Sequence, residues 1–208
     1  VTTALLLVLP AAFFFFADFS SLPVGNRLLA SFFQSVTPRT AGFNTVNLSD
    51  MTDASQAIMI FLMLIGGSPG STAGGVKTTT LAVLVANAAA TFRRQEYTHF
   101  FKRRIECGVV QTAATIVTMY LALFFFGAVF ISAYENLPLS MCLYETASAV
   151  GTVGLTLGIT PQLHVPSQMV LILLMYLGRV GGLTLIYAAL SGKRRAVAKP
   201  PLDRITVG

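Results

Sequence analysis

Five apolar segments separated by polar stretches organise the chain. They cover about residues 1–17, 54–65, 76–91, 108–133 and 167–190. A membrane-spanning helix needs about twenty apolar residues, so segment 108–133 can cross alone, whereas segment 54–65 is too short. That short segment is followed by GGSPGSTAGG and then by further apolar residues from Val76. The pattern predicts one crossing interrupted by a loop, which must be buried in protein or line a cavity because lipid offers its backbone no hydrogen bonds.

The sequence also repeats itself at a constant spacing, without a gap. We call this spacing, which separates Thr40 from Thr152, the repeat offset. The other matched pairs are Phe13 and Phe14 with Phe125 and Phe126, Gly42 with Gly154, Ser55 and Gln56 with Ser167 and Gln168, Leu62 and Met63 with Leu174 and Met175, Gly66 with Gly178, and Gly70 with Gly182. A single glycine match is common by chance, but a constant offset over most of a chain is not. We therefore expect two copies of one unit, residues 1–104 and residues 105–208.

Charge predicts how these units lie across a membrane. The basic runs FRRQEYTHFFKRR (92–104) and GKRRAVAK (192–199) each follow an apolar segment, and Lys and Arg concentrate on the cytoplasmic side. Segments 18–52 and 134–166 then lie outside, or dip into the membrane and return. Residues 138–150 form an apolar run too short to cross, opened by Pro138 at a plausible first helical turn. A short helix followed by a Thr/Gly stretch predicts a re-entrant pore loop.

Composition supports a membrane protein and excludes several other classes. The chain is 54% hydrophobic and 11% charged, whereas a soluble domain is about a quarter charged. Its net charge of +6 lies mainly in the two basic runs, so we expect no nucleic-acid partner. The glycine-rich stretch lacks the Walker order because Val76 separates Gly75 from Lys77. No nucleophile with a base and no zinc spacing is present, so we expect an all-α integral membrane protein that is not an enzyme and carries no cofactor.

The repeated Thr/Gly stretches have the chemistry of an ion-selectivity filter. A dehydrated cation needs carbonyl oxygens in place of its water shell, and glycine lets backbone carbonyls point toward a pore axis. The segment TVGLT (152–156) matches the first three residues of the potassium-channel filter TVGYG, and TAGFN (40–44) matches two of them. Either motif alone could be a glycine turn outside the membrane. Their equivalent positions in two repeats favour the pore.

These segments resemble the Trk/Ktr/HKT superfamily of potassium transporters, in which one chain carries four helix, pore loop, helix units around a single pore. TPRTAGFNTV is similar to the third filter and ASAVGTVGLTLGIT to the fourth. The loop GGSPGSTAGGVKTTT after the third filter is typical of this superfamily, and the ending PLDRITVG is similar to that of KtrB-type subunits. The resemblance covers essentially the whole chain. With two units instead of four, and a first helix that looks truncated and unlike a signal peptide, the chain resembles a C-terminal half.

The resemblance implies roles for particular residues. The filter would comprise Thr40, Ala41, Gly42, Phe43, Thr152, Val153, Gly154 and Leu155. An intramembrane gate would comprise Gly66, Gly67, Ser68, Pro69, Gly70, Ser71, Gly74, Gly75, Lys77 and Arg179, although a helix kink without a gating role is the alternative. A charge such as Arg179 inside an apolar helix is costly in lipid and usually faces a cavity or a partner. Arg179 would thus form a positive barrier below the filter, or serve only in a structural pair, and Lys77 could simply cap carbonyls.

Partners and ions also follow from the resemblance. It implies a homodimer in the lipid membrane that docks on a cytosolic KtrA-type nucleotide-binding ring. The implied location is the inner (cell) membrane of a bacterium, with several crossings and a cytoplasmic C-terminus. The transported ion would be K⁺, with Na⁺ coupled or activating. A sodium-permeable transporter of the same superfamily and a non-transporting accessory subunit are the alternatives.

Several other polar residues have simpler interpretations. We expect Arg39 and Glu145 to be structural and not ion ligands. The acids near the outer mouth, Asp18, Asp50, Asp53 and Glu135, could raise the local cation concentration, but solvation in loops is the simpler interpretation. Cys107 and Cys142 lie at opposite ends of the expected fold, so we predict no disulfide between them.

Overall fold

The computed structural model describes residues 2–20, 22–71, 73–95, 97–100 and 103–180, and within them the fold is almost entirely helical. The elements are α1 (Thr2–Ala17), α2 (Val24–Val36), the short 3₁₀ helix Leu48–Asp50, α3 (Asp53–Leu64), α4 (Thr78–Phe92), β1 (His99–Phe100), β2 (Arg103–Arg104), α5 (Cys107–Glu135), α6 (Leu139–Gly151), the 3₁₀ helix Thr160–Gln162 and α7 (Val165–Val180). The two strands have two residues each, and they form the only β-sheet in these residues, an antiparallel pair. The predicted all-α fold is confirmed.

The apolar segments correspond to helices with small shifts at their ends. Among the described residues, α5 alone is long and apolar enough to cross a membrane unaided, with a mean hydropathy of 2.2. The predicted crossing from 54 to 91 is divided into α3 and α4, and α4 begins at Thr78 instead of Val76. Pro138 is the residue before α6 and not a member of its first turn.

The end of the second repeat lies outside the described residues. The predicted segment 167–190 is described only as far as Val180, the last residue of α7. The basic run 192–199, the ending PLDRITVG and Gly182, the repeat partner of Gly70, all fall beyond that point. The expectations for them stay predictions.

The helix α2 lies within the polar stretch between residues 18 and 52. Its sequence, VGNRLLASFFQSV, mixes apolar and polar positions, and its buried residues are the polar Ser31, Gln34 and Ser35. Hydropathy alone therefore gives it no continuous apolar run. Its counterpart α6 is buried without interruption from Tyr144 to Gly151, and this stretch includes the polar Glu145 and Ser148.

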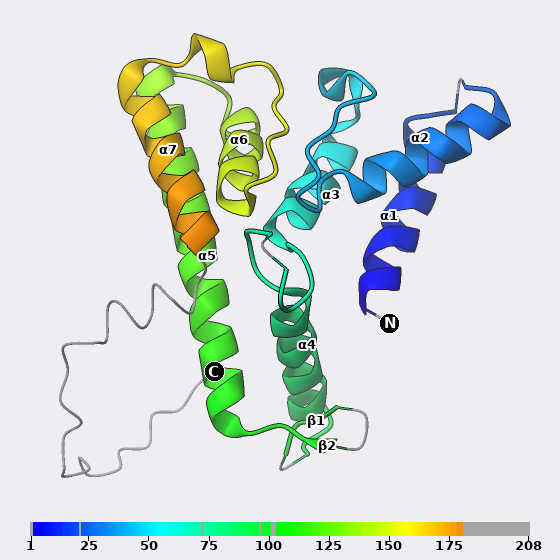
Figure 1. Cartoon of the computed structure of the whole chain (residues 1–208), viewed down its shortest axis with the longest axis vertical. Helices are drawn as coiled ribbons and strands as arrows, with labels where there is room; N and C mark the ends of the chain where they lie inside the picture. Colours follow the sequence, from blue (N-terminus) through cyan, green and yellow to red (C-terminus); the bar gives the residue numbers. More distant parts are fainter. Residues whose placement is uncertain (1, 21, 72, 96, 101–102, 181–208) are drawn as a thin grey trace.

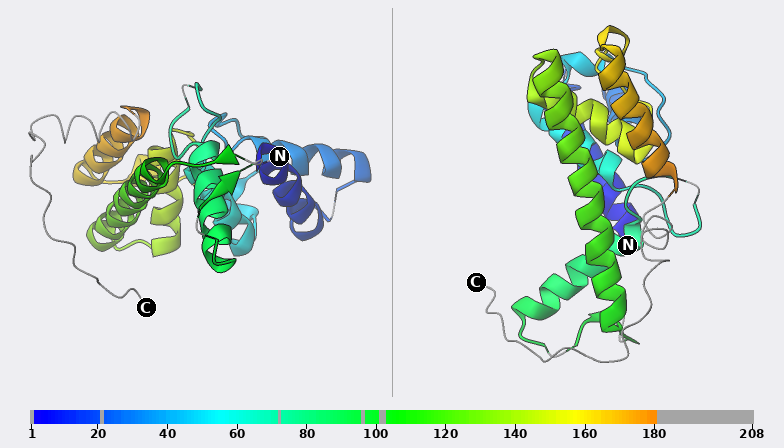
Figure 2. Two further views of the ribbon diagram at one scale, coloured as in Figure 1. Left: turned by 90° about the horizontal axis from the view of Figure 1, so that it is seen from below. Right: turned by 90° about the vertical axis from the view of Figure 1, so that its left-hand side faces the viewer.

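The helices form two groups joined through α3 and α6 (Figure 1). α6 and α7 lie beside one half of α5, whereas α4 packs against α5 toward its other end, near the strands. α1 packs against α2, and α3 packs against α6, which connects the groups. The views in Figure 2 show that α6 lies between α5, α7 and α3. One shared contact is the thioether of Met59, which accepts hydrogen bonds from Gln34 Nε2 at 3.2 Å and Tyr144 Oη at 3.7 Å. The helices α2 and α6 thus meet at one residue of α3.

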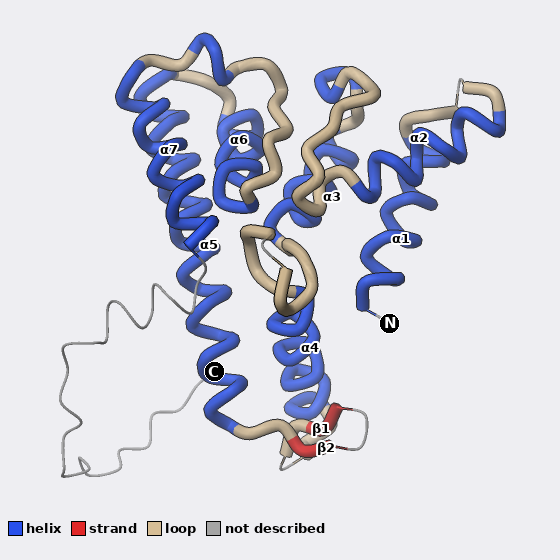
Figure 3. Tube along the Cα trace, in the orientation of Figure 1, coloured by secondary structure: helices blue, strands red, loops and turns tan. Residues whose placement is uncertain are grey.

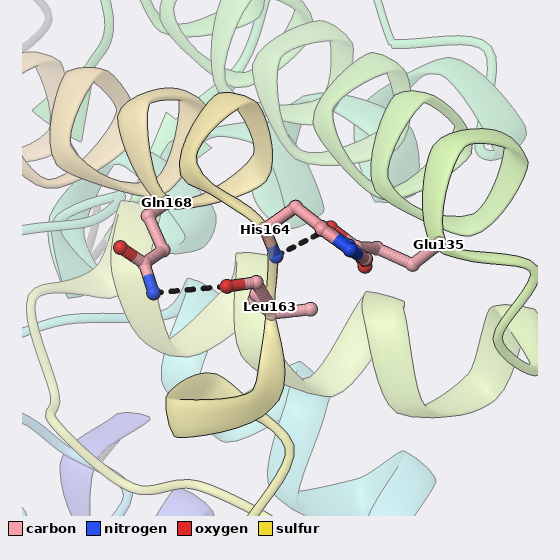
Figure 4. A network of polar contacts seen from close by, with 4 residues as sticks. All are labelled: Glu135, Leu163, His164 and Gln168. Carbon is pink, nitrogen blue, oxygen red and sulfur yellow. Dashed lines mark hydrogen bonds and ion pairs between the residues drawn. The ribbon is translucent and has the colours of Figure 1, made fainter.

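In each group a carboxylate connects the end of the first helix to the start of the last helix. The helices are α1 and α3 in one group, and α5 and α7 in the other. Asp18, just after α1, accepts hydrogen bonds from Thr52 N at 2.9 Å and from Ser55 Oγ. Glu135, the last residue of α5, accepts from His164 N at 2.9 Å, and its other oxygen lies 2.7 Å from His164 Nδ1 (Figure 4). Thr52 and His164 are separated by the repeat offset. We call these two arrangements the carboxylate clamps.

The clamps correct the expectation that Asp18 and Glu135 are solvated loop acids. The amide groups at a helix N-terminus have no partners within the helix, and a carboxylate satisfies one of them while opposing the positive end of the helix dipole. Asp50 and Asp53 are exposed, as expected. A second contact repeats beside each clamp: Gln168 Nε2 donates to Leu163 O at 3.0 Å, and Gln56 Nε2 donates to Met51 O at 3.3 Å.

Candidate ion-conduction pathway

The two glycine stretches share an unusual backbone conformation. Thr40 and Gly42 have φ angles of 68° and 74°, and Thr152 and Gly154 have φ angles of 54° and 92°. A positive φ is uncommon for threonine. Its recurrence at two threonines separated by the repeat offset therefore distinguishes these two stretches from the rest of the described chain. Two left-handed residues separated by one other residue allow successive carbonyl groups to point to the same side of the chain. The sequence reasoning identified the glycines but not the left-handed threonines.

The same two stretches lie against each other. A Cβ atom built on Gly42 would overlap the carbonyl oxygen of Val153 and lie 3.2 Å from its carbonyl carbon. A Cβ atom built on Gly154 would meet no atom within 4 Å, and Gly154 lines a hollow of about 570 Å³. The fold therefore brings residues 40–43 and 152–155 together, with a backbone carbonyl between them and open space beside the second glycine.

Different groups hold the two stretches in place. In the first, Thr37 Oγ1 donates to Phe43 O at 2.6 Å, and Thr37 O accepts from Gly42 N at 3.1 Å. In the second, Ser148 O accepts from Val153 N at 2.9 Å and Ser148 Oγ accepts from Gly154 N at 3.1 Å. The sequence reasoning missed Thr37 and Ser148. They are not at equivalent repeat positions, and no motif marks them.

The loop between α3 and α4 (Figure 3) is closed at its base by backbone hydrogen bonds, and its tip is exposed. Gly66 N donates to Val76 O at 2.8 Å, and Val76 N donates to Leu64 O at 2.9 Å. The tip, residues 68–71, is exposed, and it turns through a hydrogen bond from Ser71 N to Ser68 O and through Gly70, at φ 82°.

Lys77 connects two backbone carbonyls of the loop. Its Nζ donates to Ser71 O at 2.9 Å and to Ala73 O at 2.5 Å. Two carbonyls on one side of the loop thereby share a single cationic partner, and hydrogen bonds to a charged donor are stronger than neutral ones. The structure therefore displays carbonyl capping, which was one of the interpretations of Lys77.

This loop touches both glycine stretches. Gly74 N donates to Thr152 Oγ1 at 3.1 Å, and Arg39 Nη2 donates to Gly66 O at 3.4 Å. A Cβ atom on Gly74 would overlap the Thr152 hydroxyl and lie 2.9 Å from Gly151 O, so the close approach requires glycine. Arg39 thus contacts the loop backbone, which agrees with the structural role expected for it.

Arg179 lies at the hollow beside the second glycine stretch. The hollow is lined by Arg179 together with Glu145, Ser148, Thr152, Gly154 and Thr156. Arg179 is also near enough to Lys77 for their positive charges to repel each other. The preceding residue, Gly178, lies directly against the carbonyl of Val150 at the end of α6. The helix α7 therefore places the Arg179 guanidinium at the hollow. The neighbouring Gly178 allows α7 to approach α6 closely at this point.

This region combines backbone carbonyls, the basic side chains of Lys77 and Arg179, and the buried carboxylate of Glu145. Within the described ranges, no group of three or more His, Cys, Asp or Glu side chains is placed to hold a metal ion. Cys107 is exposed, Cys142 is buried, and both are free thiols. The arrangement offers carbonyl oxygens in a confined space with a loop of small residues beside them, which suits ion binding and passage.

Comparisons with known proteins agree with this arrangement. The family model TrkH, described as a cation transport protein, matches residues 1–194. The chain is 40% identical over 189 residues to the potassium/sodium uptake protein NtpJ of Enterococcus hirae, covering 88% of this chain and 42% of that protein. It is 35% identical over 214 residues to the Ktr system potassium uptake protein B of Vibrio alginolyticus, covering 100% of this chain and 47% of that protein.

The fold also matches a solved structure. The potassium transporter TrkH of Vibrio parahaemolyticus superposes with a TM-score of 0.76 at 23% identity, over 90% of this chain and 43% of that one. The chain spans less than half the length of each of these three proteins. Since the family model covers nearly the whole sequence, the chain belongs to the TrkH family of cation transport proteins.

Proposed function

We propose that this chain contributes two of the four pore units of a potassium uptake protein. The observation that carries the proposal is the left-handed Thr and Gly pair that recurs in two adjoining segments, Thr40 with Gly42 and Thr152 with Gly154. Carbonyl oxygens that surround an ion replace its hydration shell. The remaining two units would come from sequence N-terminal to Val1, in keeping with the greater length of the relatives.

In this proposal, residues 40–43 and 152–155 form part of the filter, and residues 66–75 with Lys77 form the gate. The gate loop would obstruct the path below the filter, and a change in its shape would open it. Its hydrogen bonds to Lys77 and Thr152 support this role because they fix one closed arrangement of an otherwise glycine-rich backbone. The basic runs favour a cytoplasmic position for the strands and for the C-terminus.

Growth on limiting potassium tests the proposal directly. The full-length gene should restore growth to bacteria that lack potassium uptake systems, and Gly154→Ser should restore it poorly. Gly154 adopts φ 92°, where any side chain is strained even without a collision. Equal rescue by both forms, at equal amounts in the membrane, would contradict the filter assignment.

Arg179 has its own test. As a positive barrier at the hollow, it would slow the passage of cations, so Arg179→Gln should change the maximal uptake rate. Arg179→Lys keeps the charge and is the matched control. An unchanged maximal rate in the Gln variant would leave Arg179 with a structural role alone.

A sodium-permeable transporter is the second candidate, because a relative at 40% identity is named a potassium/sodium uptake protein. Competition between the ions in the same cells separates the candidates. Potassium selectivity predicts that excess sodium leaves potassium uptake intact or activates it, whereas a shared path predicts inhibition and direct sodium uptake.

Assembly with a cytosolic nucleotide-binding ring of the KtrA type, and dimerisation of the membrane subunit, belong to the same proposal. Three relatives carry the name of a Ktr system. The exposed Arg93, Arg94 and Arg104, near the strands, are candidate docking residues. Purification of the full-length protein with and without the ring, followed by mass measurement, tests both associations.

A further inference from the structure

Glu145 is a buried carboxylate at the centre of α6, with 4% of its surface exposed. Burying such a group is costly unless it is paired and hydrogen-bonded, so its partners identify what it does. All three partners belong to the segment that follows the second filter. Oε1 accepts from Thr156 Oγ1 at 2.6 Å and from Leu157 N at 3.0 Å, and Oε2 accepts from Thr160 Oγ1 at 2.7 Å.

The segment 156–160 carries few other supports. Thr156 Oγ1 also accepts from Gly158 N at 2.9 Å and lies 3.1 Å from Thr160 Oγ1, which completes one network around the carboxylate. On the other side, Leu157 O accepts from Ser49 Oγ of the first half at 3.3 Å. The backbone of Leu157 is therefore fixed at its N–H by α6 and at its carbonyl by the preceding unit.

The first unit has no equivalent of this network. At the repeat offset, Phe33 stands in place of Glu145, Asn44 in place of Thr156 and Leu48 in place of Thr160. The first filter is held instead by the Thr37 hydroxyl. A helix buried on nearly all sides would ordinarily favour an apolar residue at this position, so the carboxylate requires a reason beyond packing.

We infer that Glu145 is a positioning residue for ion selection: its carboxylate fixes residues 156–160, and through them the carbonyls of Val153 to Leu155 beside the pore. The inference rests on the proposed function. Glu145 itself contacts no ion in this account. It sets the distance between filter carbonyls by anchoring the return segment to α6, and that distance decides which dehydrated cation is held best.

A glutamine cannot reproduce the anchor. Three donors converge on two carboxylate oxygens, and an amide places a donor where one oxygen accepted. Charge-assisted bonds are also about twice as strong as neutral ones. Glu145→Gln in the full-length protein should therefore raise the KM for potassium by roughly tenfold and increase inhibition of uptake by sodium. The maximal rate per transporter should change less.

Thr160 supplies a milder test with a matched control. Thr160→Val removes one donor and keeps the carboxylate, so the KM for potassium should rise by roughly three- to fivefold. Thr160→Ser retains the hydroxyl, so its KM for potassium should stay at the native value. Thr146→Val alters a buried threonine of the same helix whose hydroxyl bonds to the helix carbonyls of Cys142 and Leu143, and it should leave the KM unchanged.

The outcomes separate this inference from the proposed function. Absence of uptake by the native full-length protein, in cells where it is present in the membrane, would overturn both. Native uptake together with an unchanged KM and sodium sensitivity in the Gln and Val variants would overturn this inference alone. A merely structural role would reduce the amount of protein without altering either quantity. If Glu145→Gln fails to reach the membrane, the Val and Ser pair at Thr160 decides the question.

Discussion

The helices α3 and α7 are followed or ended by different residues at matched positions, and the difference explains why α3 gives way to a loop where α7 continues. In the first half, the inner helix ends at Leu64 and the chain turns into the loop at Gly66. In the second, the equivalent Gly178 lies inside α7, which continues to Val180. The following residue is Gly67 in one half and Arg179 in the other. A second glycine and Pro69 favour a break, whereas arginine and valine allow the helix to continue.

What the halves share is equally informative. The left-handed residues of the two glycine stretches and the glutamine bond to the preceding turn recur at the repeat offset, and a carboxylate clamp is present in each half. The groups that hold the two glycine stretches do not recur. Backbone conformation is thus common to both halves, whereas the side chains behind it have diverged. Substitutions at matched positions should reveal this division.

The largest difference is expected at Gly42 and Gly154, the glycines of the proposed filter. Gly42→Ala adds strain of about 1–3 kcal/mol at a positive φ and also drives a methyl group into the carbonyl of Val153. Gly154→Ala adds only the strain. Potassium uptake by the full-length protein should fall by more than roughly tenfold in the first variant and clearly less in the second. Equal losses would show that the contact with Val153 is unimportant.

A smaller effect is expected where α7 approaches α6. A methyl group at Gly178 would overlap the carbonyl of Val150, and overpacking of this kind costs about 1–3 kcal/mol. Heating of the detergent-solubilised protein should show a lower denaturation midpoint for Gly178→Ala. Gly108→Ala, in a helix position with no atom within 4 Å, is the control and should be neutral or slightly stabilising. A matching decrease in both variants would count against close packing as the cause.

The smallest effects are expected at the clamps. Asp18→Asn and Glu135→Gln each weaken a charge-assisted hydrogen bond at a helix start, so each should lower the denaturation midpoint slightly. Because the clamps belong to different halves, their effects on the midpoint should add. Asp53→Asn changes an exposed acid in the first turn of α3 and should have less effect than Asp18→Asn. A double variant no less stable than either single one would mean that the clamps are not independent.

Much of the fold could be predicted from the sequence because the membrane restricts the choices. Long apolar segments must be helices when lipid satisfies no backbone group, and the Gly-rich interruption predicted the division into α3 and α4. The gap-free repeat paired Thr40 with Thr152, which share a left-handed backbone in the structure. The helix α2 escaped detection because its buried face is polar, as Ser31 and Gln34 demonstrate.

The contacts that hold the two glycine stretches could not be predicted, for a physical reason. Thr37, Ser148 and Glu145 act through hydrogen bonds to backbone groups or hydroxyls. Many polar side chains can make such a bond when they lie close enough to the partner atom. No spacing rule therefore identifies them. The repeat predicted only one side of the clamps. Thr52 aligns with His164, but the carboxylates that bind them, Asp18 and Glu135, do not align at the repeat offset.

The carboxylate clamps have a mechanical consequence. Both lie at the end of the fold to which the chain returns after each glycine stretch, and none of the described carboxylate contacts joins α4 to the opposite end of α5. The clamped ends therefore have carboxylate bonds between helices that the half of the bundle containing α4 does not show among the described residues. In the proposed pore, this difference would let the passage change its radius at one end while the geometry proposed to discriminate between ions stays constant at the other.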